Sequence, residues 1–200
     1  MSTPNMHDKS WRPYFISSHE LSFAQECAGG AYMDSAPLSD QFSKDLHIVV
    51  LVACNEQSGY VRWSELPRMA DNKVHPDDFQ NVFDSAFLNA IEFRPPQTPS
   101  FILSESGLTK QVSLGGTNDS LLLVVGSFWR KLNAHCKGRL MASCPDNDIL
   151  LLADSGAQGA LAELTKRTED CYQSSSKPLS KSLLVFNEYT WEDAADDKLP

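Results

Sequence analysis

The residue types that most often carry chemistry in proteins are concentrated in one short stretch of this chain. Residues 136–154, CKGRLMASCPDNDILLLAD, contain two cysteines and three aspartates, and His135 immediately precedes them. These side chains are zinc ligands elsewhere, but zinc requires ligands that converge at about 2.0–2.3 Å. Neighbouring side chains such as His135 and Cys136 point about 100° apart on a helix, so they rarely share a metal ion. The sequence Pro145-Asp146-Asn147-Asp148 is instead typical of a turn, and we predict a β-hairpin without a metal site.

A cysteine nucleophile is the second chemistry to consider. Cys54 ends an apolar stretch, a position where nucleophiles occur. Three histidines are candidates for its base: His47, His75 and His135. A reactive thiolate requires an electropositive and partly exposed environment, whereas the acidic Glu56 follows two residues later. We therefore favour a packing role for Cys54 and keep the nucleophile as the alternative.

Paired carboxylates are plentiful but have structural explanations. General acid–base catalysis requires two carboxyl groups that face one cleft with separated pKa values. The pairs here fall at an expected helix start, in a turn or in an acidic tail: Asp77-Asp78, Asp146 with Asp148, Glu192-Asp193 and Asp196-Asp197. The glycines at 115–116 and in 155–161 match no phosphate-binding pattern. We assign no catalytic, metal-binding or cofactor-binding residue.

Composition restricts the class of partner. The chain has 200 residues, of which 42% are hydrophobic, and this is enough to bury a sizeable core. A formal net charge of −9 disfavours binding to nucleic acid or to an anionic membrane, since both require a basic surface. The four basic residues Arg130, Lys131, Lys137 and Arg139 are expected to form a solvated face. An acidic chain suits electrostatic attraction to a basic protein partner.

Cysteine usage and hydropathy indicate the compartment. The five cysteines are scattered and include no C-x-x-C pair, a pattern typical of reduced thiols in a cytosol. The first residues, MSTPNMHDKSWRPYF, lack the apolar run of a signal peptide. No apolar run approaches the length of a membrane span. We expect a cytoplasmic protein.

The N-terminal half contains two clear elements. Residues 46–54, LHIVVLVAC, predict a buried strand, and 60–63 alternate as a return strand would. A helix is predicted after Pro76, because seven apolar residues recur at helical spacing: Phe79, Val82, Phe83, Ala86, Phe87, Ala90 and Ile91. Pro95-Pro96 must end it.

The C-terminal half alternates strands and helices. Strands are predicted at 101–103, 111–114, 139–144, 149–153 and 183–186, and helices at 128–136 and from Gly156 to about Gln173. The run 121–125 is compatible with a strand or with a helix capped by Asp119 or Ser120. This order predicts an α+β fold, with a mainly antiparallel sheet and helices packed on one face.

The expected domain organisation has three parts. Residues 1–44 are expected to be an irregular segment that wraps the core, with one short β-like run at 14–16. Residues 45–190 are expected to form one α+β domain, either undivided or as two interlocked halves, 45–115 and 116–190. The residues from 191 to 200, WEDAADDKLP, are expected to be an acidic disordered tail.

Several stretches resemble the YtpQ-like family of uncharacterised bacterial proteins. They are SLLLVVGSFWRKLNAHCKGRLMASCPDNDILLLAD, GALAELTKRTEDCY and PLSKSLLVF, preceded in the expected order by DLHIVVLVAC and HPDDFQNVFDSAFLNAIEF. The resemblance covers about residues 45–187 with gaps. Its motifs are packing and turn motifs, so it implies a fold and no catalytic residues.

Two functions follow from these observations. The first is a non-catalytic protein-binding domain, such as an immunity-type inhibitor or adaptor that binds a basic partner. Its anchor would be a patch of exposed aromatic residues: Tyr60, Trp63, Trp129 and Trp191. The alternative is an enzyme of unrecognised class, a hydrolase that uses Cys54 or paired aspartates. We prefer the first, because each catalytic candidate has an adequate structural explanation.

Overall fold

The computed structural model describes residues 11–27, 39–54, 57–60, 99–113, 119–124, 126–188 and 190–194. The chain forms two compact units, each described here by itself. Unit 1 comprises Met1–Phe42 and His47–Pro96, and unit 2 comprises Ser43–Leu46 and Gln97–Pro200. The long apolar helix predicted over 79–91 and the strand residue Trp63 lie outside the described residues.

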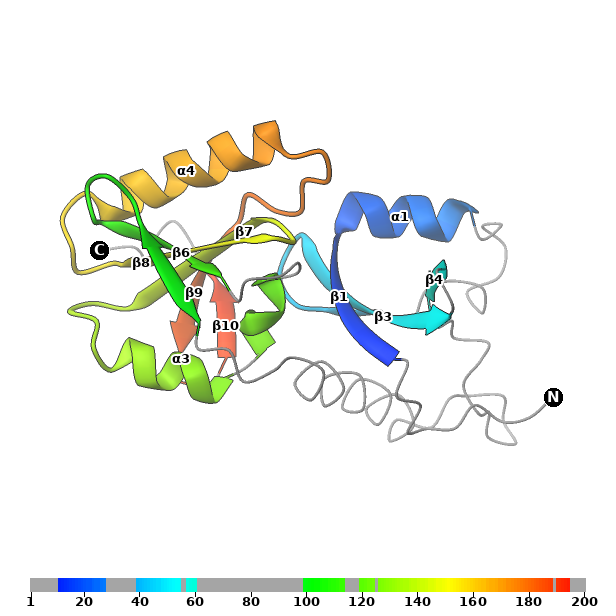
Figure 1. The fold of residues 1–200 in the computed structure, drawn as a ribbon, viewed down its shortest axis with the longest axis horizontal. Coiled ribbons are helices and arrows are strands. Elements are labelled where there is room, and N and C mark those ends of the chain that lie inside the picture. The colour runs from blue at the N-terminus through cyan, green and yellow to red at the C-terminus, as the bar shows by residue number, and fades with distance from the viewer. Residues whose placement is uncertain are drawn as a thin grey trace. The chain divides into compact units, whose positions relative to one another are not determined.

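Unit 1 contains a sheet built around one apolar strand (Figure 1). Its described elements are β1 (Trp11–Ser17), α1 (Ser18–Cys27), β2 (Ser39–Gln41), β3 (Leu46–Cys54) and β4 (Gln57–Tyr60). Strand β3 lies between β1 and β2 and pairs antiparallel with β2 and β4. The predicted strand at 46–54 is confirmed, and its return strand begins three residues earlier than predicted.

The N-terminal segment is more regular than its sequence suggested. Residues 11–27 form a strand and a helix, and Ile16 and Leu21 pack against Val49 of β3. The ring of Phe15 contacts that of Phe42 edge-on at 5.0 Å. The β-like run predicted at 14–16 lies within β1. The rest of these residues was expected to be irregular, but it is ordered because its apolar side chains join the core of unit 1.

Unit 2 is a six-stranded antiparallel sheet with helices. Its strands are β5 (Ser100–Leu103), β6 (Thr109–Ser113), β7 (Leu140–Asp146), β8 (Ile149–Asp154), β9 (Leu183–Asn187) and β10 (Thr190–Asp193). They lie in the order β10-β9-β7-β8-β6-β5, and each neighbouring pair is antiparallel. The helices are the 3-10 helix η3 (Asp119–Val124), α3 (Gly126–Asn133) and α4 (Ala160–Ser174). The predicted α+β class and mainly antiparallel pairing are confirmed, and the run near 121–125 is helical.

The predicted β-hairpin is the centre of this sheet. Strands β7 and β8 pair with Met141 opposite Ala153 and Ser143 opposite Leu151. The turn is held by its own polar groups, since the backbone N–H of Asp148 donates to Oδ1 of Asp146 at 2.9 Å. The aspartates of this stretch therefore shape the turn, as the sequence predicted.

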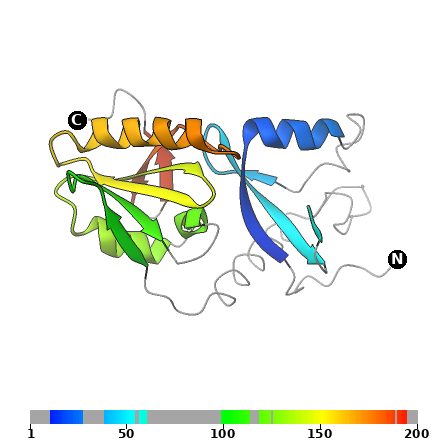
Figure 2. The same cartoon turned by 45° about the horizontal axis from the view of Figure 1, so that its top comes forward.

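Helices cover both faces of the unit 2 sheet, whereas the sequence analysis expected them on one face. Figures 1 and 2 show α4 and α3 on opposite sides of it. On the α4 face, Met141, Leu151 and Ala153 pack against Ala160 and Leu164. The difference arises because Leu140–Asp146 is buried at all but its last position, so this strand is apolar on both faces and each requires cover.

The α3 face is closed by a chain of aromatic rings. The ring of Trp191 in β10 contacts that of Phe186 in β9, with 5.2 Å between the ring centres, and that of Trp129 in α3, with 5.3 Å. The ring centres of Trp129 and Phe128 lie 4.6 Å apart. Both indole N–H groups donate to η3, Trp129 to the carbonyl oxygen of Leu122 at 2.6 Å and Trp191 to that of Leu123 at 3.0 Å. These bonds satisfy the polar atoms of two buried indoles.

Strand β10 corrects the expectation of a disordered tail that begins at residue 191. Trp191 is 5% exposed, and its strand pairs with β9 along its whole length. The reason is the aromatic side chain, which packs into the core although acidic residues surround it in the sequence.

Replacing Trp191 measures how much this aromatic chain stabilises unit 2. Trp191→Ala should lower the free energy of unfolding by about 3–5 kcal/mol, because it leaves a large cavity. Trp191→Phe retains a ring but leaves the Leu123 carbonyl unpaired, and should cost about 1–3 kcal/mol. Chemical denaturation gives both values, with the exposed Thr190→Ala as the control. Equal stability of all three variants would contradict the structure.

Candidate functional site

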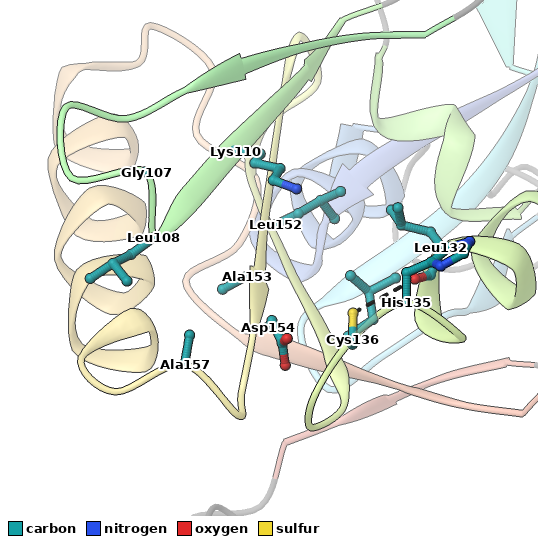
Figure 3. Close-up of a pocket in the computed structure, with 11 residues that line it drawn as sticks. Gly107, Leu108, Lys110, Leu132, His135, Cys136, Leu152, Ala153, Asp154 and Ala157 are labelled. Atoms are coloured by element: carbon teal, nitrogen blue, oxygen red, sulfur yellow. Dashed lines mark hydrogen bonds between the residues drawn. The ribbon is translucent and has the colours of Figure 1, made fainter.

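Unit 2 contains a pocket of about 200 Å³ beside the end of α3 (Figure 3). Apolar side chains form most of its wall: Leu108, Leu132, Leu140 and Leu152. Four residues bring polar groups to it: Lys110 of β6, His135 and Cys136 after α3, and Asp154 at the end of β8. The pocket therefore collects part of the stretch that the sequence singled out, and its chemistry can be tested group by group.

Asp154 is a structural anion. Its carboxylate accepts hydrogen bonds from the backbone N–H groups of Lys137 at 2.7 Å, Gly138 at 2.8 Å and Gly156 at 2.9 Å. Burial raises the pKa of Asp154, but these bonds and the charge of Lys137 lower it by more, so the net pKa lies below its ordinary value. The ionised carboxylate thus fastens the loop before β7 to the turn after β8.

We call these three hydrogen bonds the Asp154 clamp, and they also explain why residues 138 and 156 are glycines. A Cβ on Gly138 would lie 2.4 Å from the backbone nitrogen of Gly156, and a Cβ on Gly156 would lie 2.5 Å from that of Gly138. Neither distance is sterically allowed, so both positions require glycine for close approach of the two backbones.

The thiols of unit 2 are not activated. Burial and the negative charge of Asp154 raise the pKa of Cys136, and only the charge of Lys110 opposes them. The Cys136 thiol donates to the carbonyl oxygen of Leu132 at 3.7 Å. Burial also raises the pKa values of Cys144 and Cys171. All three thiols stay protonated near neutral pH and lack the thiolate that nucleophilic catalysis requires.

Hydrogen bonds give two of the candidate carboxylates a structural role. Asp146 accepts from Asp148 and from the hydroxyl group of Ser175, while Asp193 accepts from the backbone of Lys44 at 2.8 Å. Asp77-Asp78, Asp196-Asp197 and the side chain of Cys54 lie outside the described residues. Within the part of the chain that the structure describes, no group of three His, Cys, Asp or Glu side chains could hold a metal ion. No described helix is long and apolar enough to cross a membrane.

The most unusual surface of unit 2 is the outer edge of β5. Among the strands that the structure describes, it is the last in the order of the sheet. Its side chains are exposed although three of them are large and apolar: Phe101 at 40%, Ile102 at 55% and Leu103 at 59%. We call these three residues with their backbone the β5 edge.

The register of β5 shows which backbone groups face outward. The N–H of Ser104 donates to the carbonyl oxygen of Thr109 at 3.0 Å, which continues the pairing of β5 with β6. Alternate residues of an antiparallel strand point their N–H and C=O groups to opposite sides. The backbone groups of Ile102 therefore face β6, and those of Phe101 and Leu103 face away from it.

The β5 edge is held in place from both faces of the sheet. On the α3 face, the ring of Phe101 stacks on that of Phe128, with 6.5 Å between the ring centres. On the α4 face, Glu163 accepts from the hydroxyl groups of Ser106 and, at 2.6 Å, of Thr109. Arg167 donates to the Thr109 hydroxyl group at 2.7 Å. Helix α4 thus fixes the turn between β5 and β6, and with it the strand.

Two of the four predicted aromatic anchors are buried. Trp129 is 0% and Trp191 5% exposed, so the expectation that they could form an exposed patch was wrong for these two. Both are needed to cover the α3 face of the sheet. Tyr60 lies in β4 and Trp63 follows it, and the side chains of both are outside the described residues.

Strand β5 could be predicted from the sequence, but its exposure could not. A short apolar run normally predicts a buried strand, so the local signal pointed away from a surface site. The position of β5 at the end of the sheet depends on which distant strands pair, and no short motif encodes that order.

Comparison with protein-family models, with curated proteins and with solved structures found no match to this chain. The resemblance to the YtpQ-like family therefore stays a prediction.

The Glu163 cluster makes stability depend on pH in a defined direction. Hydrogen bonds from Ser104, Ser106 and Thr109 lower the pKa of Glu163 from 4.5 to about 2. Because the folded pKa is depressed, its ionised form stabilises the protein above pH 4.5, and this contribution is lost as the pH falls toward 2. Glu163→Gln should therefore be less stable than the wild type near neutral pH, with a difference that shrinks between pH 4.5 and 2.

Urea denaturation across this pH range checks the expectation. Glu105→Gln, in the turn between β5 and β6 that Glu163 contacts, controls for the loss of one negative charge. A Glu163→Gln difference that stays constant down to pH 2.5 would contradict the role given to the carboxylate.

Proposed function

We propose that this protein is a non-catalytic protein-binding domain, and that the β5 edge receives an extended segment of its partner as an added strand. The observation that carries the proposal is the exposure of three consecutive large apolar residues on a terminal strand. Peptide segments bind such edges through backbone hydrogen bonds and through contacts of alternate side chains. An adaptor or an immunity-type inhibitor belongs to this class.

The opposite edge of the same sheet supports this interpretation. Exposed sheet edges are usually protected by charged side chains, because open edges pair with other chains. Strand β10 follows that rule, since Glu192 and Asp193 are exposed on it. Strand β5 has Ile102 and Leu103 instead. One edge of the sheet is protected against strand pairing, and the other is suited to it.

The energies set the strength of such binding. Phe101 and Leu103 offer four outward backbone groups, and a protein hydrogen bond contributes about 0.5–1.5 kcal/mol net. Covering a half-exposed large apolar side chain adds roughly 1 kcal/mol. These gains are offset by an association cost of about 4 kcal/mol or more. A short segment alone should bind weakly, and a tight partner must make further contacts.

The alternative of a hydrolase has less support. The described thiols are protonated, Asp154 holds backbone N–H groups, and Asp146 shapes a turn. Each group has a partner that accounts for its presence.

Selection of random peptides displayed on phage against the immobilised full-length protein tests the proposal. Leu103→Pro removes an outward-facing N–H without breaking the ladder to β6, and proline is tolerated at such edge positions. Leu103→Thr keeps that N–H and loses the apolar side chain. We expect peptides selected on the wild type to bind Leu103→Thr about tenfold more weakly and Leu103→Pro not at all.

Circular dichroism and urea denaturation establish that both variants are folded. Selected peptides that bind all three proteins equally would place the binding surface elsewhere, and no enrichment of any peptide would contradict the proposal.

A further inference from the structure

The α3 side of the β5 edge carries positive charge although the chain as a whole is acidic. Lys110 lies directly opposite Leu103 in the register of β5 and β6, so the two side chains share a face. Its ammonium group lies 6.0 Å from the centre of the Phe101 ring, and the residue also lines the pocket beside α3. Lys110 is exposed.

A second exposed lysine lies on α3, one helical turn after the residue that contacts this strand. Phe128 stacks on Phe101, and Lys131 follows three residues later on α3. Residues three apart lie on the same side of a helix, so Lys131 is on the side of α3 that faces β5. It is exposed, and within the described part of the chain neither Lys110 nor Lys131 forms an ion pair.

The acidic residues nearest to these lysines form no described ion pair with them. Asp154, which lines the pocket with Lys110, accepts hydrogen bonds from three backbone N–H groups. Glu105 is exposed in the turn beyond Leu103. Glu163 belongs to the α4 face and is occupied by Ser106 and Thr109. On the α4 side of the edge, the exposed Ile102 stands opposite the uncharged Gln111. The two faces of β5 therefore differ in chemistry, one cationic and one apolar.

We propose that the partner segment is an acidic β-strand whose carboxylates alternate with apolar residues. Side chains of a strand point alternately to its two faces. In an added strand, one set would meet Lys110 and Lys131, and the other would cover Ile102. Glutamate suits the first set, because its methylene groups can cover Leu103 while its carboxylate reaches a lysine. This inference rests on the proposed docking at β5 and specifies its partner.

The inference opposes what the net charge predicts. A chain with a formal charge of −9 should attract basic segments and repel acidic ones. Over distances longer than about 10 Å these whole-chain forces are screened at 0.1 M salt, whereas contacts with adjacent lysines persist. The sign of the preferred peptide thus separates a local recognition site from general electrostatic attraction.

The test uses two eight-residue peptides with blocked ends, in which valine alternates with glutamate or with lysine. Each is titrated into ¹⁵N-labelled full-length protein in 0.1 M salt, and the amide signals of β5 are followed. We expect the glutamate peptide to bind about fivefold more tightly than the lysine peptide. The amides of Phe101 and Leu103 should shift most, because their N–H groups face the added strand, and that of Ile102 should shift less.

Matched variants locate the source of the preference. Lys110→Gln/Lys131→Gln should remove the fivefold difference. Lys166→Gln/Lys177→Gln changes the net charge equally at two exposed lysines, on α4 and after it, and should leave the difference intact. A glutamate peptide with a central proline should lose binding if the backbone pairs.

The outcomes separate the two proposals. A lysine peptide that binds β5 as tightly or more tightly would overturn the acidic partner and leave strand docking standing. A preference for glutamate that survives Lys110→Gln/Lys131→Gln would also overturn it. If neither peptide shifts Phe101 or Leu103, or if the proline peptide binds equally well, docking at the β5 edge itself is contradicted.

Discussion

The arrangement of unit 2 depends on one constraint, which is that its central hairpin is apolar on both faces. Strands β7 and β8 present Met141 and Leu151 to one side and Leu140 and Leu152 to the other, and all four are buried. Each face must be covered, because exposed leucine and methionine surface is costly in water. Helix α4 covers one face, and α3 with the aromatic chain that includes Trp191 covers the other.

The two edge strands of the sheet are covered to different extents, and the candidate site lies at the less covered one. On the β10 side, Trp191 brings the aromatic chain almost to the edge, and acidic residues protect the outer strand. On the β5 side, Phe128 of α3 stacks on Phe101, but Ile102 and Leu103 remain exposed. The turn after β5 is fixed by Glu163, so the strand is held firmly with its outer side open. A rigid strand loses less conformational entropy than a mobile strand when it binds a partner.

Much of unit 2 could be predicted from local sequence, because its hairpin and helices have local causes. The Pro-Asp-Asn-Asp turn and the apolar runs beside it predicted β7 and β8, and the spacing of Leu161, Leu164 and Thr168 predicted α4. What failed depends on distant pairing. Trp191 is followed by acidic residues and resembled a tail, yet it is buried against α3. The exposure of β5 and the Asp154 clamp arise only when segments far apart in the chain meet. The net charge is a sum over the whole chain, so it could not indicate the two lysines near β5.

The most direct test of an open β5 edge is residue-resolved amide hydrogen exchange of the free full-length protein. The account predicts an alternation along one strand, in which the amides of Ile102 and Ser104 are protected by β6 and those of Phe101 and Leu103 exchange rapidly. Saturation with a docked peptide should then protect Phe101 and Leu103 as well. Equal protection of all four amides in the free protein would mean that the edge is already occupied, and would contradict the account.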